Sequence, residues 1–360
     1  MNPRERIMAT LMGEEPDKIP VVAADYLRKT SQGGWLRRLE KRGLGVIRLI
    51  SPYKPAFVHP HSMNPNVEGV VFHSRYYMEK GVPKCRNTFE TPVGEITELL
   101  RFNQMDFGAC ATEENFIKEP RDWAVINFIF GEIIKNLRPN FDEYNMVDDE
   151  LGDRGLAYAT VEKTPFQRSF VELATPERTF VDFAEEPDEF LEFLELQLIL
   201  HRKIAEIVRE CPAPYIDVMD HITDIISPRY YKKFCLPIYQ IYKDALKGTG
   251  KKLGAHMDGR FGHLKKEIAE APLDVMESFT VPPVGDVSLT EARELWPDKT
   301  LFINCPPHLN WAEPDEARSG YEAIAEEWNS KKGLLIEHSE EIPLERIEGN
   351  LSAALDVFGY

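Results

Sequence analysis

The 360-residue chain carries 60 acidic against 43 basic residues, a formal net charge of −17. This excess of negative charge would repel phosphate backbones and anionic lipid surfaces, so we expect neither nucleic acid nor a membrane as a partner. No run approaches the ~20 apolar residues of a membrane span, and the residues after Met1 predict an amphipathic helix rather than the apolar core of a signal peptide. We therefore expect a cytoplasmic protein.

Five scattered cysteines, without a C-x-x-C pair, argue against a disulfide framework. Most are expected to be small buried residues. With 43% hydrophobic residues, the chain can form a large core, so it is predicted to be globular.

The first elements are a helix and two strands. Asn2 is a candidate helix cap, Pro3 suits the first helical position and Gly13 is a stop signal. Strands are predicted at residues 19–23 and 45–50, with a helix at 35–42 between them. Residues 84–100, with Pro92 and Gly94 between two strand-like arms, predict an inserted β-hairpin.

From residue 156 onward, strand-like and helix-like segments alternate, which is typical of parallel strands joined by crossover helices. The predicted strands are residues 156–159, 215–219, 252–255, 275–278, 300–304 and 333–336. Together with the two earlier strands they make eight. The sequence thus predicts a (β/α)8 TIM barrel over residues 1–360, a single domain with N-terminal helical and β-hairpin elaborations, whose chemistry follows the carboxyl ends of the strands.

One strand end carries His256 and Asp258, two residues apart and before Gly259. In extended chain, residues i and i+2 point to the same side, so the imidazole and the carboxylate could face one site. The alternative is that Asp258 caps the following helix and His256 is a hydrogen-bonded rim residue. Both interpretations stay open.

The next three strand ends add Glu277, Cys305 and either Glu340 or His338. Together with His256 they offer N, O and S donors, which suit zinc better than magnesium. Catalytic zinc usually has three protein ligands, so some of these residues would orient ligands or handle protons. Cys305 could instead be a small buried residue, and Glu337 a solvated acid where the last helix starts.

Earlier strand ends contribute Asp25 and Tyr26 after the first strand, and Asp217, Asp220 and His221 around residues 215–219. Asp220 and His221 are expected to face the mouth of the barrel. The sequence contains no P-loop, no early G-x-G-x-x-G and no G-x-S-x-G elbow, which argues against nucleotide-dependent and serine-hydrolase chemistry.

Over nearly its whole length, the sequence resembles the uroporphyrinogen decarboxylase superfamily, which also contains zinc-dependent, corrinoid-linked methyltransferases. The resemblance rests on segments in a fixed order: PRER at 3–6 leading to GEEPDKIP at 13–20, ETPVG at 90–94, SPRYY at 227–231 through Leu236-Pro237, His256-x-Asp258-Gly259, and EEIP at 340–343 with Asn350. The resemblance implies a (β/α)8 barrel, in agreement with the strand count.

Two departures from the family patterns narrow the implied function. The arginine motif that binds porphyrinogen carboxylates is absent after the first strand, where residues 21–30 read VVAADYLRKT. Thiol-activating methyltransferases of the superfamily often bind zinc through an H-x-C motif and a cysteine at the end of the last strand. Here the motif is H-x-D, and Glu340 stands at the position that matches this cysteine. In these features the sequence is more similar to corrinoid methyltransferases that act on methoxylated substrates.

The resemblance therefore implies the first component of an O-demethylase system, which moves a methyl group from a methoxylated donor to the cobalt of a separate corrinoid protein. The donor is expected to be aromatic. Its expected cofactors are zinc and a corrinoid carried by that partner, and a homodimer is left open. The expected roles are catalysis by Asp220, His256 and Asp258, substrate binding by Asp25, Tyr26 and His221, and metal binding by His256, Glu277, Cys305 and Glu340. The alternatives are a metal-free decarboxylase or lyase of a small carboxylic acid, and a non-catalytic barrel that binds a ligand or protein.

Overall fold

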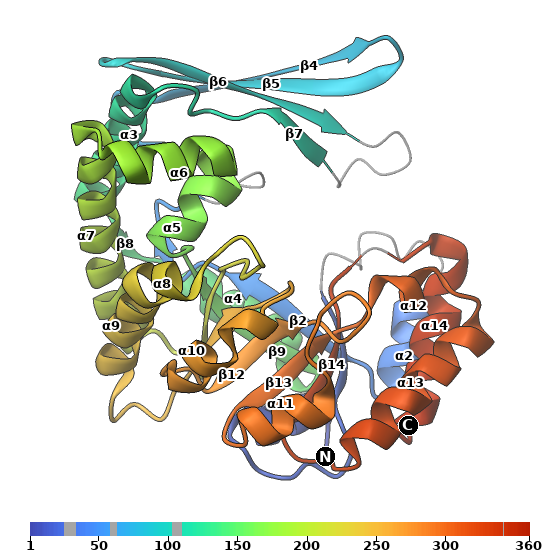
Figure 1. Cartoon of the computed structure of the whole chain (residues 1–360). Helices are drawn as coiled ribbons and strands as arrows, with labels where there is room; N and C mark the ends of the chain where they lie inside the picture. The colour runs from blue at the N-terminus through green and yellow to red at the C-terminus, as the bar shows by residue number, and fades with distance from the viewer. Residues whose placement is uncertain (25–33, 58–62, 103–109, 341) are drawn as a thin grey trace. The chain divides into compact units, whose positions relative to one another are not determined.

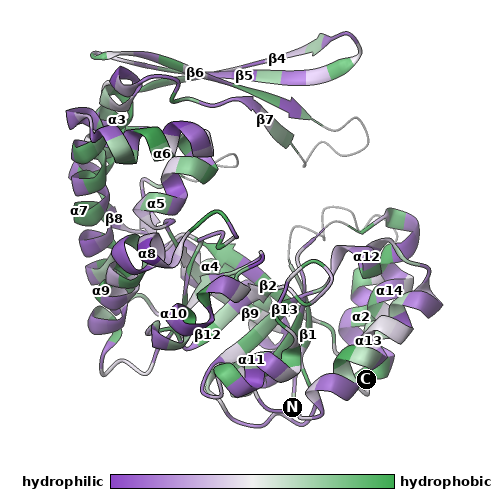
Figure 2. Cartoon of the chain, in the orientation of Figure 1, coloured by the Kyte–Doolittle hydropathy of each residue, from purple (hydrophilic) through white to green (hydrophobic). Residues whose placement is uncertain are grey.

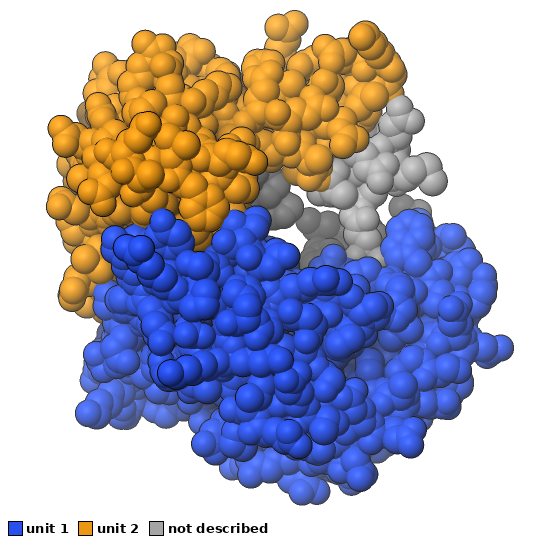
Figure 3. Space-filling view, viewed as in Figure 1, with its two compact units in different colours: residues 1–52, 140–161, 208–360 blue, residues 53–139, 162–207 orange. Residues whose placement is uncertain are grey.

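The computed structural model describes residues 1–24, 34–57, 63–102, 110–340 and 342–360 (Figure 1). Within them the chain forms two compact units, coloured separately in Figure 3. Unit 1 comprises residues 1–52, 140–161 and 208–360, and unit 2 comprises residues 53–139 and 162–207. The expectation of one domain over the whole chain is not tested by this division and stays a prediction.

Unit 1 contains a closed barrel of parallel strands, in the order β1-β14-β13-β12-β11-β10-β9-β2. The strands are β1 (Val21–Ala24), β2 (Gly45–Ile50), β9 (Gly155–Val161), β10 (Tyr215–Val218), β11 (Lys252–His256), β12 (Val275–Phe279), β13 (Thr300–Asn304) and β14 (Leu334–His338). All eight predicted strands are present, and the predicted (β/α)8 barrel is confirmed. The main error lies in the strand ends, since β1 starts two residues later than predicted and β14 runs two residues further.

Helices pack around the barrel strands (Figure 1). They are α1 (Pro3–Leu11), α2 (Trp35–Arg42), α4 (Phe141–Leu151), α8 (Pro228–Tyr230), α9 (Leu236–Leu246), α10 (Lys265–Glu270), α11 (Leu289–Leu295), α12 (Pro307–Trp311), α13 (Pro314–Trp328) and α14 (Leu344–Val357). In α1, Asn2 forms the predicted cap, because its side chain accepts from the backbone N–H of Glu5.

Apolar residues recur at helical spacing along these helices, as the alternating colours of Figure 2 show. In α13 the buried side chains are those of Ala317, Tyr321, Ile324 and Trp328. None of the helices in the described ranges is both long and apolar enough to cross a membrane.

The barrel interior is filled by side chains that point inward from several strands. This core contains Val22, Ile47, Leu156, Tyr158, Tyr215, Val275, Phe302 and Leu335. Because side chains alternate across a strand, the residues two positions later also point inward, toward the carboxyl ends of the strands. This alternation positions the candidate site.

Unit 2 contains a four-stranded antiparallel sheet in the order β4-β5-β6-β7. Its strands are β4 (Val71–Glu79), β5 (Val82–Thr91), β6 (Gly94–Phe102) and β7 (Cys110–Glu114). The hairpin predicted at residues 84–100 is confirmed as β5 and β6, which are joined at Pro92 and Val93. Unit 2 also contains the short pair β3 (Tyr53–Lys54) and β8 (Arg138–Pro139), the helices α3 (Trp123–Asn136), α5 (Pro165–Arg168) and α6 (Pro176–Glu185), and most of α7 (Asp188–Glu210).

Candidate active site and metal centre

Polar side chains form the inward-facing layer above the apolar core of the barrel. Each lies two residues after a core residue on the same strand: Asp217 after Tyr215, Glu277 after Val275, Asn304 after Phe302 and Glu337 after Leu335. All four are buried. The sequence pattern, an apolar inward residue followed at i+2 by an acid or amide, places them in one layer.

Gly254 makes room for part of this layer. A Cβ atom at Gly254 would lie 2.1 Å from the Tyr215 hydroxyl oxygen, so a larger residue would displace the tyrosine. The hydroxyl instead donates to Oδ1 of Asp217 at 2.8 Å. Glycine at this position on β11 therefore allows the contact between Tyr215 and Asp217.

His256, the last residue of β11, is held by Glu277 of the neighbouring strand. Its Nδ1 lies 2.5 Å from Oε2 of Glu277, and the two residues are paired in the parallel ladder. Burial by itself would lower the pKa of His256, but the negative charges of Glu277 and Asp258 outweigh it and raise the pKa well above 6.5. Glu277 and Asp258, on either side of the ring, thus favour the protonated form of His256.

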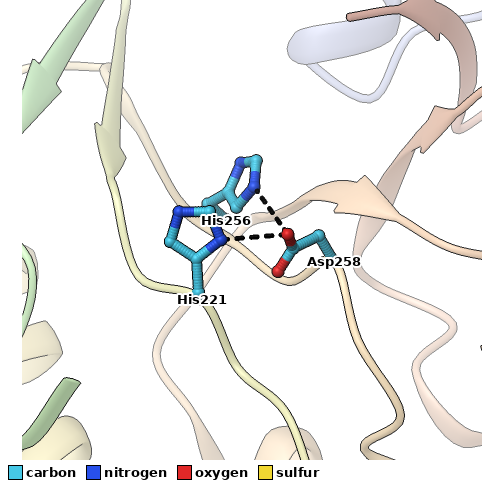
Figure 4. Close-up of side chains that lie close together, drawn as sticks. All are labelled: His221, His256 and Asp258. Atoms are coloured by element: carbon cyan, nitrogen blue, oxygen red, sulfur yellow. Dashed lines mark hydrogen bonds and ion pairs between the residues drawn. The ribbon is translucent and has the colours of Figure 1, made fainter. Parts of the chain in front are cut away.

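His221, His256 and Asp258 converge at the mouth of the barrel (Figure 4). Oδ2 of Asp258 lies 2.9 Å from Nδ1 of His221 and 3.5 Å from Nε2 of His256. Burial would raise the pKa of Asp258, but His256 and His221 hold it well below 3.8. The other carboxylate oxygen, Oδ1, is buried without a hydrogen-bond partner. The expectation that His256 and Asp258 face one site agrees with this geometry.

The pKa values of Asp217 and Glu337 are shifted in the opposite direction to that of Asp258. Burial first, and then the negative charge of Glu277, raise the pKa of each carboxyl well above its usual value. One oxygen of each, Oδ2 of Asp217 and Oε2 of Glu337, lacks a hydrogen-bond partner. Burial and the charge of Glu277 therefore favour the protonated form of both carboxyls.

Glu337 is not among the predicted site residues. The predicted last strand ends at residue 336, with Glu337 expected as a solvated acid, whereas Glu337 lies within β14 and is buried. The available signal was the alternation from Leu335 to Glu337, which matches that from Val275 to Glu277.

Cys305 lies away from this site. Asn304 points into the barrel, so the next residue points outward, and Sγ of Cys305 lies 3.2 Å from the hydroxyl oxygen of Tyr321 on α13. Burial raises the pKa of the Cys305 thiol to about 12. His338 follows the inward Glu337 in the same way, and its ring centroid lies 5.9 Å from that of Tyr321.

The remaining predicted residues occupy separate positions. Oδ2 of Asp220 accepts from the hydroxyl of Tyr239 on α9 at 2.6 Å, and Asp220 is buried. Glu340 is exposed and accepts from Nδ2 of Asn304 at 3.0 Å. Asp25 and Tyr26, the predicted substrate-binding residues, lie outside the described residues.

The metal set expected from the sequence is therefore not brought together. Among the described residues, the group whose donor atoms could bind one ion is His221, His256 and Asp258, with atoms within 4.8 Å of one another. Two imidazole nitrogens and a carboxylate oxygen suit zinc and would leave one position open. Glu277 completes the fit, because a carboxylate that accepts from the second nitrogen of a histidine orients that ligand.

Comparisons with known proteins agree with the barrel. The family model described as uroporphyrinogen decarboxylase (URO-D) matches residues 167–358, more than half of the chain. No curated protein sequence matches the chain.

Among solved structures, a methyltransferase from Methanosarcina mazei is similar over 100% of both chains, with 15% identity and a TM-score of 0.57, which supports the fold. A dihydrodipicolinate synthase from Oceanobacillus iheyensis aligns over 64% of this chain and 63% of its own, with 11% identity and a TM-score of 0.27, too low to support an argument. By the family match, with the barrel and its strand-end site, the chain belongs to the uroporphyrinogen decarboxylase (URO-D) family.

Proposed function

We propose that this protein is a methyltransferase that moves a methyl group from a methyl ether, in particular a methoxylated aromatic, to the cobalt of a corrinoid carried by a partner protein. The observation that carries the proposal is the group of His221, His256 and Asp258, with His256 oriented by Glu277. Membership of the family and the similarity in fold to a methyltransferase support it.

Different side chains would bind the metal, orient its ligands and shape the pocket. His221, His256 and Asp258 would hold zinc, which would act as a Lewis acid on the ether oxygen. Glu277 keeps Nε2 of His256 directed at Asp258, because it fixes the opposite nitrogen of the ring. Asp220, held by Tyr239, would shape the pocket beside His221.

The transfer balances without an oxidant or a reductant beyond the reduced corrinoid. The ether C–O bond would break with its electron pair left on oxygen, and the pair for the new bond to carbon would come from the reduced corrinoid of the partner protein. The oxyanion then takes a proton. The carboxyls of Glu337 and Asp217, whose pKa values are raised by burial and by the charge of Glu277, are buried candidates for the proton donor in the layer that contains Glu277.

The test is incubation of the zinc-loaded protein with cob(I)alamin and a panel of donors, followed by absorbance measurement of methylcobalamin. The panel contains methoxylated aromatics, methanol and methylamines. We expect methylation with at least one aryl methyl ether, and loss of it in His256→Ala. Failure with every ether, in a preparation with about one zinc per chain, would refute the proposal.

One observation favours a second candidate, a decarboxylase or lyase of a small carboxylic acid. The carboxyls of Asp217 and Glu337, whose raised pKa values favour the protonated form, could protonate a carbanion left by loss of carbon dioxide. This candidate needs no metal. Carbon dioxide release from small carboxylic acids by chelator-treated protein, with no methyl transfer, would favour it.

A further inference from the structure

The outer strand of the sheet in unit 2, β4 (Val71–Glu79), has an unusually open edge. In the described part of the chain, β4 pairs with β5 on one side and has no strand on the other. It pairs with β5 residue by residue, without a bulge, and contains no proline. In natural edge strands, a bulge or a proline is one of the features that prevent pairing with another chain.

The turn between β4 and β5 fixes which backbone groups face this edge. Lys80 and Gly81 form a two-residue turn and both have positive φ, 49° and 81°, as in a type I′ hairpin. Glu79 and Val82 then form the first hydrogen-bonded pair, and such pairs alternate along the ladder. The backbone N–H and C=O groups of Phe72, Ser74, Tyr76 and Met78 consequently point away from β5.

Two of these residues, Tyr76 and Met78, present large apolar side chains to solvent. Tyr76 is 72% exposed and Met78 65% exposed, and the Tyr76 ring centroid lies 6.1 Å from that of Phe102 on β6. Large exposed apolar side chains beside an open strand edge are typical of a surface that pairs with another strand.

The sequence of β4 is complementary to itself in one antiparallel register. With Tyr76 on a two-fold axis, Tyr76 lies opposite Tyr76 of the second copy, and Ser74 lies opposite Met78. On the other face, His73 lies opposite Glu79, and Arg75 lies opposite Tyr77, whose ring the Arg75 guanidinium of the same strand already approaches at 6.0 Å. A register centred on Arg75 would instead place two guanidinium groups opposite each other.

We infer that β4 pairs with β4 of a second copy of this chain, antiparallel and centred on Tyr76, to form one eight-stranded sheet across a two-fold axis. A two-fold contact of this kind is closed and does not propagate. A contact between two single strands is expected to be smaller than the ~800 Å² per partner of a standard stable interface, so the dimer should dissociate on dilution. This inference is independent of the proposed activity.

The test is sedimentation equilibrium of the full chain from about 1 to 200 μM, together with hydrogen exchange of the β4 amides at both ends of that range. We expect a concentration-dependent dimer and at least tenfold slower exchange at Ser74 and Tyr76 at high concentration. Tyr76→Asp, which places two carboxylates opposite each other on the axis, should weaken dimerisation at least tenfold. Tyr76→Pro removes an N–H that faces the open edge and should have the same effect.

Met146→Asp is the matched control, because Met146 on α4 is 65% exposed and belongs to the other unit. Circular dichroism melts of each variant show whether it folds, and Tyr76→Phe should keep the dimer. A wild-type chain that is monomeric at 200 μM overturns the inference. A dimer that survives both Tyr76→Asp and Tyr76→Pro overturns it equally.

Discussion

His256 and Glu277 occupy paired positions on the neighbouring strands β11 and β12, and the imidazole Nδ1 lies 2.5 Å from Oε2 of the carboxylate. The contact joins two residues 21 positions apart and leaves Nε2 directed toward Asp258. It makes Glu277 a positioning residue for His256 in the proposed site.

Glu277→Gln should weaken zinc binding by about 10- to 100-fold while leaving the fold intact, because the amide keeps an acceptor for Nδ1 but removes the charge that makes the ring a better ligand. The measurement is a chelator competition titration. Glu340→Gln is the control, since Glu340 is exposed and contacts Asn304. Equal zinc affinity in wild type and Glu277→Gln would mean that Glu277 does not act through His256.

Replacement of His221, His256 or Asp258 by alanine should each abolish near-stoichiometric zinc, because catalytic zinc sites rarely tolerate the loss of one of three protein ligands. Cys305→Ser should retain the metal, since the thiol is buried against Tyr321. Zinc content, measured by elemental analysis of the dialysed proteins, decides between this group of ligands and the one expected from the sequence, which includes Cys305. Zinc lost from Cys305→Ser but kept by His221→Ala would favour the set expected from the sequence.

His338 should make the protein sensitive to acid. Burial lowers its pKa to about 3, against about 6.5 in an unfolded chain, so between these values the unfolded state binds more protons and stability rises with pH. Between pH 7.5 and pH 5 the loss attributable to His338 is about 2 kcal/mol.

His338→Gln cannot titrate, so its free energy of unfolding should fall by about 2 kcal/mol less than that of wild type over this interval, in urea titrations at both pH values. The matched control is His308→Gln, at an exposed position, which should keep the wild-type pH dependence. An unchanged pH dependence in His338→Gln would show that His338 is accessible to protons in the native state.

Arg168→Met in unit 2 should lower the free energy of unfolding by about 3–5 kcal/mol, because it leaves the buried carboxylate of Glu162 without the cation that pairs with it, whereas Glu172 keeps its ion pair with Lys163. The Arg168 guanidinium pairs with Glu162 and donates to Glu172 at 3.0 Å, and all three side chains are buried. Arg38→Met is the comparison, since the Arg38–Glu348 pair is exposed and screened by solvent, so its loss should lower the free energy of unfolding far less. Urea denaturation that gives similar losses for the two variants would contradict this assignment.

The apolar strands and their alternation with helices were readable from the sequence, because a fully buried parallel strand is a short apolar run and each crossover needs an amphipathic helix. The ends of the strands were not, since the acid Glu337 after the apolar run that ends at Ile336 resembles the end of a strand, although the strand continues and places this acid inside the barrel. That error of two residues moved Glu337 and His338 out of the barrel wall and hid the inward acid of β14.

Part of the candidate site was also predictable, because it depends on the local spacing of residues in one segment. His256 and Asp258 share one segment, and their spacing was enough to place them together. His221 joins them from the loop after β10, and Cys305 is removed from them because its side chain points to α13.

By itself, the sequence determined the eight-stranded barrel, the family resemblance and the concentration of polar residues at strand ends, because hydrophobic periodicity and motif order are local properties of the chain. Only the tertiary structure decided which of those residues meet. Inward or outward direction depends on the register of each strand in the closed barrel, so Glu277 reaches His256, Glu337 is buried inside the barrel, and Cys305 lies against Tyr321.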